Sequence, residues 1–246
     1  MKEQLQKDFD NTIKNLSLSQ KDIEIKKFSL DNFINKGFPN RKEEDWKFSD
    51  LNQIINKNIG ELSFYNDYTS TNKVDTSVFV DGLEHNKIVF INGRIEKIDF
   101  DYEKKGQIEI IDQSETINKF DNNNSLSDLN NAFTNKCFKI VIKTGYQLLK
   151  PLIIYHTTNS KIWSKNINLR LDFELQEDSC LRLIDLFNDT SEKNFLNIFY
   201  NFNLKEDAIL KNYKVDKLEN KNIKYSFNNI VQNKNTISET FILSSG

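Results

Sequence analysis

Cysteine and histidine are the residues in this sequence whose types could bind a metal or take part in acid–base chemistry. The chain of 246 residues contains two cysteines, Cys137 and Cys180, and two histidines, His85 and His156. A metal–sulfur cluster needs about four ligands, whereas these cysteines are 43 positions apart and belong to no CxxC or Cys–His cluster. We therefore predict no metal site, and we expect both cysteines to be partly buried, reduced thiols.

The two histidines have different surroundings in the sequence. His156 follows the apolar run 152–155, and we expect it at the surface or at the end of a strand. His85 lies in a polar stretch that we expect to be a loop, and we assign it no role. Neither histidine is predicted to be catalytic.

Acidic residues occur in clusters that could supply a pair of carboxylates for acid–base hydrolysis, which needs them about 5–10 Å apart. The clusters at 177–178 and 206–207 fall in predicted turns, and residues 99–103 (DFDYE) are expected to form an acidic loop beside a strand. The sequence also lacks the GxxxxGK[ST], GxGxxG and GxSxG motifs. We predict that the chain is not an enzyme, and no cofactor-binding residue is identified.

One unusual stretch is KGFPNRKEEDWKFSDL, residues 36–51. Gly37 and Pro39 are expected to end a helix there. We expect the charges at 41–45 to face water, and Trp46 with Phe48 to anchor the helical region onto the rest of the protein. The stretch is interpreted as a junction rather than an active site.

Charge and hydropathy narrow the classes of function. The net charge is −2, and acidic and basic residues are interspersed without a basic stripe, which argues against nucleic-acid binding. The N-terminal residues MKEQLQKDFD carry no apolar secretion signal, and no apolar run approaches the ~18 residues of a membrane span. We expect a cytoplasmic protein with no membrane partner.

The elements that must position these residues fall into three predicted regions. Residues 1–60 are expected to be helical, with Leu5, Phe9 and Ile13 on one face. A second helix is expected over 29–37, capped at its start by Ser29 or Asp31. A short helix is expected over 49–56.

Residues 61–124 are expected to connect this helical region to the core. The segment 87–97 (KIVFINGRIEK) predicts two strands about an Asn92–Gly93 turn, and 107–112 predicts a third strand. Residues 120–133 predict a loop and then one or two helical turns, capped by Ser125 or Ser127.

The remaining region, 125–246, is dominated by apolar residues that alternate with period two. Strand–turn–strand units repeat, with turns anchored at Gly145, Asp178, Asp207 and Asn235 at spacings of 33, 29 and 28 residues. A stacked β-solenoid explains this repeat, and an antiparallel β-sandwich is the alternative. In this alignment Cys180 occupies a small-residue position that Ala208 holds in the next unit. Two of the expected strands each place five residues on a single face. In the first strand they are Ile167, Leu169, Leu171, Phe173 and Leu175, and in the second they are Leu196, Ile198, Tyr200, Phe202 and Leu204.

The predicted fold class is therefore α+β, with an N-terminal helical region followed by a β-helix that is incomplete at its C-terminal end. The last residues, TISETFILSSG, are expected to form a strand without the terminal cap that solenoids need. We expect that the chain is a fragment or that another chain covers this end, and that the isolated chain self-associates through it.

Several of these segments, taken in order, resemble the SufB/SufD family of scaffold subunits, and in particular its SufD branch. The segment GFPNRKEEDWKFSDL is similar to the N-terminal signature of that branch, and IVFINGRIE is similar to its next apolar strand. LNNAFTNKCFKIVIKTGYQLLKPLIIYH resembles the start of the family's core, and LQEDSCLRLID and LKEDAILKNYKV resemble its repeated turns. The resemblance covers all 246 residues.

The resemblance implies a right-handed parallel β-helix and a non-enzymatic role in the SufBCD complex, which assembles iron–sulfur clusters. It implies a SufB-like paralogue and the ATPase SufC as partners, with ATP bound by SufC. It also implies that the C-terminal helices that bind SufC, and the late rungs involved in cluster formation, have no counterpart in this sequence. The alternative functions are a β-helix carbohydrate-active enzyme and a β-solenoid interaction protein.

Overall fold

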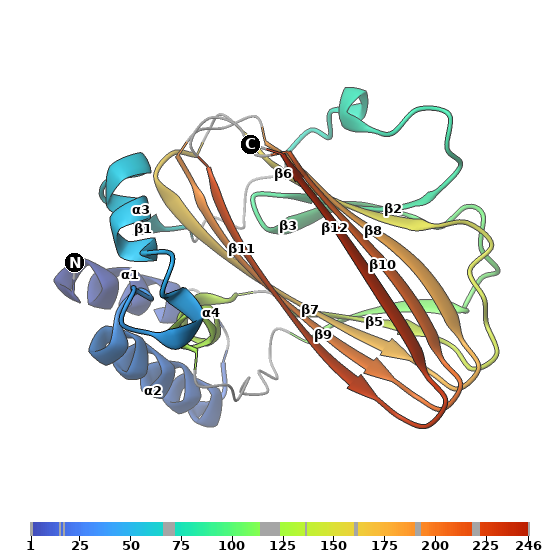
Figure 1. Ribbon diagram of the computed structural model, residues 1–246, viewed down its shortest axis with the longest axis horizontal. Helices are drawn as coiled ribbons and strands as arrows, with labels where there is room; N and C mark the ends of the chain where they lie inside the picture. The colour runs from blue at the N-terminus through green and yellow to red at the C-terminus, as the bar shows by residue number, and fades with distance from the viewer. Residues whose placement is uncertain are drawn as a thin grey trace.

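A bundle of short helices lies against one end of two long, packed β-sheets (Figure 1). The computed structural model describes residues 2–14, 16, 18–65, 72–113, 124–135, 137–159, 162–189, 193–217 and 222–245. The strands after residue 137 pair in parallel with the strands of the next repeat, which makes the core a β-solenoid. The predicted α+β class is confirmed, and the antiparallel sandwich is excluded.

The N-terminal region contains α1 (Lys2–Lys14), α2 (Gln20–Lys36), the short 3-10 helix η1 (Glu44–Trp46) and α3 (Leu51–Asn58). The predicted start of the second helix at Ser29 or Asp31 is wrong, because Ser19 caps α2 and accepts a hydrogen bond from the Asp22 amide at 3.2 Å. Ser29 is fully buried inside the helix. Gly37 ends α2 with a φ of 75°, as expected.

The connecting region contains β1 (Ser63–Phe64), the 3-10 helix η2 (Thr76–Val78), β2 (Asn86–Ile91), β3 (Arg94–Asp99) and β4 (Ile108–Asp112). The predicted hairpin is confirmed, since β2 and β3 are antiparallel and Asn92 and Gly93 have φ angles of 53° and 80°. Two consecutive positive φ angles match the turn type that Asn-Gly favours.

Helix α4 (Ser125–Phe133) follows, but its cap is Asn124 rather than Ser125 or Ser127. The Asn124 side chain accepts a hydrogen bond of 2.8 Å from the Leu126 amide. The predicted loop over 120–123 lies outside the described residues. The division of the chain at residues 60 and 124 stays a prediction.

In the part of the chain that the structure describes, the solenoid has eight strands that alternate between two sheets. The first sheet has the order β11-β9-β7-β5-β4, with β1 beside β7, and the second has the order β12-β10-β8-β6-β2-β3. Strands β3 and β4 are antiparallel to their neighbours β2 and β5, so the parallel stack begins with an antiparallel strand on each sheet. The solenoid strands are β5 (Cys137–Ile142), β6 (Leu152–Thr158), β7 (Lys165–Leu175), β8 (Cys180–Asp189), β9 (Phe195–Leu204), β10 (Ile209–Lys217), β11 (Ile223–Gln232) and β12 (Ile237–Ser245).

The turns between the sheets repeat in register, as the sequence predicts. Gly145, Asp178, Asp207 and Asn235 all have positive φ angles, between 57° and 70°. Each turn hydrogen-bonds to the next one: the Asp178 amide donates to the Glu206 carbonyl, and the Asp207 amide donates to the Lys234 carbonyl, both at 3.1 Å. Asp and Asn tolerate this left-handed conformation better than most residues, which explains why they recur here.

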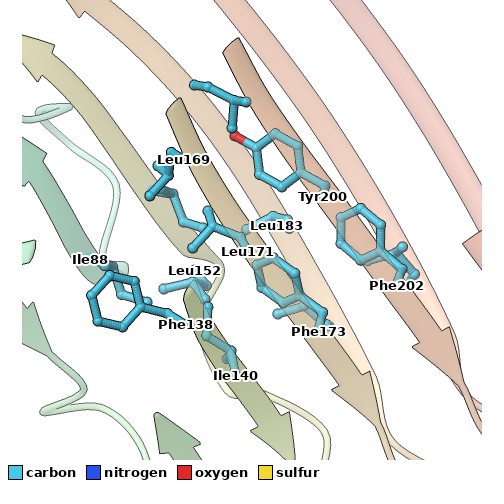
Figure 2. Packing of buried hydrophobic residues seen from close by; sticks show 14 of the residues in the cluster. Ile88, Phe138, Ile140, Leu152, Leu169, Leu171, Phe173, Leu183, Tyr200 and Phe202 are labelled. Atoms are coloured by element: carbon cyan, nitrogen blue, oxygen red, sulfur yellow. The ribbon is translucent and has the colours of Figure 1, made fainter. Parts of the chain in front are cut away.

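Between the two sheets lies a core of aliphatic and aromatic side chains stacked in columns (Figure 2). Strands β7 and β9 place the ten predicted residues inward, and in register Leu171 lies beside Tyr200 and Phe173 beside Phe202. The rings of Phe173 and Phe202 stack with centroids 4.9 Å apart. Full burial of each such side chain contributes roughly 1.5–3 kcal/mol, so these columns hold successive turns together.

Helix α4 is attached to the outer face of the first sheet by buried asparagines. The Asn197 amide group donates to the Leu126 carbonyl at 2.9 Å, and that of Asn130 donates to the Asn197 carbonyl at 2.8 Å. Lys26 of α2 donates to three carbonyls at the end of α4, including that of Thr134 at 2.6 Å. These bonds connect the helical region to the solenoid.

Among the described residues, no helix has the length and apolar character that a membrane-spanning helix requires.

Candidate functional site

The interior of the solenoid changes from apolar to polar along the stack, and this change brings several titratable groups together. In the first sheet, Lys224 and Ser226 on β11 lie in register with the inward residues Leu196 and Ile198 on β9. In the second sheet, Asp185 on β8 and Lys214 on β10 lie in register with the inward residue Ile154 on β6. Charged side chains therefore occupy positions that hold the apolar core in earlier turns.

Asp185 is the centre of this cluster and is fully buried. The Tyr200 hydroxyl donates a hydrogen bond of 2.6 Å to Asp185 Oδ2, and His156 Nε2 lies 3.2 Å from Oδ1. His156 Nε2 is also 2.9 Å from the Tyr200 oxygen. Because the Tyr200 proton is directed to Asp185, this geometry places the imidazole hydrogen on Nε2, where the tyrosine oxygen can accept it.

Two lysines balance the buried negative charge. Lys214 Nζ lies 3.5 Å and Lys224 Nζ 3.8 Å from Asp185 Oδ2, and Lys224 pairs more closely with Asp216, at 2.6 Å. Lys214 also lies over the Tyr200 ring, 3.9 Å from its centroid. With the partly exposed Asp216, the two lysines face two carboxylates, and such pairing is how a protein interior accommodates ionised groups. We call Asp185, His156, Tyr200, Lys214 and Lys224 the interior cluster.

Burial and mutual charge set the pKa values in the interior cluster. Burial would raise the pKa of Asp185, but Lys224, His156 and Lys214 together hold it well below its ordinary value. Burial lowers the pKa of His156, against the attraction of Asp185, so its neutral form is favoured. Burial also lowers the pKa of Lys214, to about 8, and raises the pKa of Tyr200 well above its ordinary value.

Next to the interior cluster are polar groups that have no hydrogen-bond partner in the described chain. Both side-chain atoms of Asn212 on β10 and the oxygen of Asn228 on β11 are buried and unsatisfied. Both residues are on the inward faces of the later turns, in register with Leu183 and with Tyr200. The later turns therefore carry buried polar groups in register with inward residues of the earlier turns.

The structure corrects the predicted place of His156 and shows that both histidines are buried. His156 is buried in the interior cluster, stacked on Phe90 with ring centroids 5.3 Å apart, rather than at the surface or a strand end. The period-two alternation of Leu152, Ile154 and His156 was the signal for this inward position. His85 lies in the loop before β2, as expected, but its side chain is buried and its Nε2 lies 2.8 Å from the Tyr155 hydroxyl.

The two cysteines are not brought together. Cys137 is on β5 in the first sheet and Cys180 is on β8 in the second, and both are free thiols. Burial, with Asp172 next in importance, raises the pKa of Cys137 to about 12, and burial also raises the pKa of Cys180. Both therefore favour the thiol form, which is a poor metal ligand. The predicted equivalence of Cys180 with Ala208 is wrong by one residue, because Cys180 pairs in register with Ile209.

The acidic turn residues at 177–178 and 206–207 are exposed at the corners of the solenoid, as predicted. Within the described ranges, no three histidine, cysteine or acidic side chains form a group that could hold a metal ion. Glu103, assigned to an acidic loop, proves to be a structural acceptor. It takes hydrogen bonds from the Tyr146 hydroxyl at 2.6 Å, the Asn86 amide group at 2.7 Å, and the backbone of 149 and 150 at 3.1 Å. These partners lie 17 to 47 residues away in the chain, so the local pattern around Glu103 does not indicate them.

The junction at 36–51 behaves largely as expected. Residues 41–45 are exposed, and Trp46 is partly buried against the helical cluster, with its ring 6.0 Å from that of Tyr225 on β11. Trp46 therefore connects the helical region to the solenoid. The expected anchoring by Phe48 is wrong, because its side chain is 87% exposed.

No family model and no curated protein sequence matches the chain.

Proposed function

We propose that this protein is a SufD-like scaffold subunit of an iron–sulfur cluster assembly complex. The observation that carries the proposal is the order of the motifs, each of which falls at a defined point of the solenoid architecture. The Trp46 segment lies between α2 and α3, the Asn92–Gly93 turn joins β2 and β3, and the Gly145 turn joins the first parallel strands. Helical region, hairpin and repeated turns thus follow the order that the resemblance implies.

The physical character of the core supports a role in holding other proteins in place. Parallel strands with identical inward spacing form a long, regularly packed body, and α4 and Lys26 connect the helices to it. Such a body provides rigid surfaces at fixed positions, as solenoid proteins commonly do. In this proposal a SufB-like paralogue binds the scaffold, and the ATPase SufC binds and hydrolyses ATP.

The two thiols fit this supporting role better than a direct role in holding a cluster. They lie in different sheets, and burial favours their protonated forms. We therefore assign no cluster ligand to this chain by itself, and the iron and sulfur are the cargo of the whole complex.

Reconstitution of cluster assembly tests the proposal. A SufB-like and a SufC-like protein from the same source would be supplied with iron, sulfide, reductant and ATP, and cluster formation would be followed by visible absorbance. Adding this chain is expected to increase the yield of the cluster. As a matched control, the Tyr200→Asp variant, which places a second carboxylate beside Asp185, should not increase it. An equal yield with and without the wild-type chain would contradict the proposal.

A further inference from the structure

The outer face of the second sheet carries two neighbouring columns of apolar side chains that cross β6, β8, β10 and β12. The residues of each column lie side by side in the strand register. We call the eight residues the outer stripe. The first column is Ile153, Ile184, Tyr213 and Phe241, and the second is Tyr155, Leu186, Val215 and Leu243.

One half of the outer stripe is covered by the chain itself. Val74, Phe79 and Val80 pack over Ile153 and Tyr155, which are fully buried. The Phe79 ring lies 4.9 Å from the Tyr155 ring, and the Val80 amide donates a hydrogen bond of 3.1 Å to the Tyr155 hydroxyl. Figure 1 shows the segment that contains η2 beside β2, at the far side of the sheet from β12.

The other half of the outer stripe is open. Tyr213 is 40% exposed, Phe241 58% and Leu243 54%, while Val215 between them is partly exposed. These four side chains belong to two adjacent strands and form one patch. A contiguous exposed apolar patch with polar residues at its rim is typical of an interaction site.

Basic residues border the open half on both sides. Lys211 and Lys217 lie on the same outward face of β10 as Tyr213 and Val215. Lys211 comes two residues before Tyr213, and Lys217 comes two residues after Val215 at the end of the strand. Arg182 extends the first border on β8 and is exposed. Glu239 provides one acidic group, 3.5 Å from Lys211. Among the described residues, these borders hold three basic groups and one acidic group, which favours a partner with acidic residues beside its apolar residues.

The covered half shows the form that such a partner takes. The segment 78–80 (Val-Phe-Val) is flanked in the sequence by Asp75 and Asp81, and Lys87 and Lys97 each lie 5.9 Å from the Phe79 ring. A short apolar segment with acidic flanks, which leaves the 3-10 helix η2 and continues as extended backbone at Phe79, thus already lies on this face beside lysines. We propose that Tyr213, Val215, Phe241 and Leu243 bind a short apolar segment of this type from a partner protein.

A second copy of the chain fits this patch less well. Face-to-face packing of two identical outer stripes would bring the lysine borders of both copies together, and like charges in close approach are unfavourable. The proposal does not depend on the role in cluster assembly, because it rests only on the outer face of β10 and β12.

A peptide copied from the chain's own covering segment is the probe. The synthetic peptide NKVDTSVFVDG, residues 72–82, would be titrated into the full chain, with the same peptide carrying Phe79→Ser as a control ligand. We expect saturable binding that becomes about tenfold weaker, or about 1.4 kcal/mol, in Phe241→Ser and in Leu243→Ser. The variant Phe48→Ser removes an exposed aromatic side chain elsewhere and is expected to bind normally.

A charge variant keeps the test valid if the serine variants fold poorly. Lys211→Glu with Lys217→Glu leaves the apolar side chains in place and should weaken binding, with a smaller effect at high salt. Absence of saturable binding to the wild-type chain would overturn the proposal. Unchanged binding in the Phe241, Leu243 and lysine variants would also overturn it, because the peptide would then occupy another site. So would self-association that Phe241→Ser abolishes while the peptide fails to compete, because a second copy would then be the occupant.

Discussion

The hydroxyl group of Tyr200 on β9 donates a hydrogen bond of 2.6 Å to the carboxylate of Asp185 on β8, across the interior of the solenoid. This bond joins the two sheets at the point where the apolar core gives way to charged residues. Asp185 is kept ionised there by Lys224, His156 and Lys214, despite complete burial. The interior cluster is thus a polar link between sheets that are otherwise held together by apolar packing.

Tyr200→Phe removes this link without changing the packing of the ring. We expect a loss of about 2 kcal/mol in the free energy of unfolding, because a buried carboxylate loses a charge-assisted hydrogen bond. The midpoint of urea denaturation measures the loss. Tyr213→Phe is the matched control, since that side chain is 40% exposed, and it should change stability by less than about 0.5 kcal/mol. Equal effects of the two variants would mean that the Tyr200 hydroxyl does not contribute.

His156 predicts a loss of stability on mild acidification. Its pKa is lowered by burial, so the unfolded chain binds a proton near pH 6.5 while the folded chain stays neutral. Stability should therefore fall as the pH decreases below about 6.5, until the folded-state pKa is reached. The contribution of Asp185, whose pKa is depressed, is lost only at pH values below the ordinary carboxyl pKa of 3.8.

The variant His156→Phe should reduce the fall in stability below pH 6.5. Asp185, Tyr200, Lys214 and Lys224 face this position and remain in the variant. Denaturant titrations at several pH values, on the wild type and the variant, provide the comparison. An unchanged slope would show that another group causes the acid sensitivity.

Lys26 predicts the same rise of stability with pH, in a more alkaline range. Burial lowers its pKa to about 7, against the attraction of Asp22, whereas the unfolded chain holds the proton up to the ordinary value of 10.5. Stability should rise between pH 7 and about pH 10, because the unfolded state binds more protons in that window. Lys26→Met should reduce this rise and leave the remainder due to Lys214, whose pKa is about 8. A rise of equal size in Lys26→Met would contradict this assignment.

The repeated turns predict a position-specific response to substitution. Asp207 has a φ of 58°, a conformation that glycine adopts readily and β-branched residues adopt poorly. Asp207→Gly should leave the stability nearly unchanged, whereas Asp207→Val should cost about 1–2 kcal/mol. Thermal denaturation of the two variants gives the comparison. Glu206, at the neighbouring exposed position, is the control, since Glu206→Val does not face the same backbone strain.

Local patterns in the sequence account for much of the fold. The turns at Gly145, Asp178, Asp207 and Asn235 could be found because one backbone conformation recurs with one kind of residue. The inward faces of β7 and β9 could be found because their residues alternate between apolar and polar, apart from Phe195 and Phe199, which are apolar at outward positions of β9. Both signals depend on neighbours in the chain, so sequence spacing is sufficient to detect them.

The interior cluster could not be assembled in the same way. His156 and Asp185 each continue an apolar alternation in their own strand, but only the parallel register brings them together with Tyr200. Charged residues at inward strand positions could have indicated a polar interior. We expected an apolar core and did not interpret them in that way. Lys26 was missed for a similar reason, because its partners on α4 lie more than a hundred residues away.

Native mass spectrometry of the chain mixed with a SufB-like and a SufC-like protein from the same source tests the scaffold role most directly. We predict a complex whose mass exceeds that of the SufB-like and SufC-like proteins together by 29.0 kDa for each copy of this chain. We also predict no complex between this chain and the SufC-like protein alone. Spectra in which the SufB-like and SufC-like proteins associate, while this chain remains free, would contradict the account.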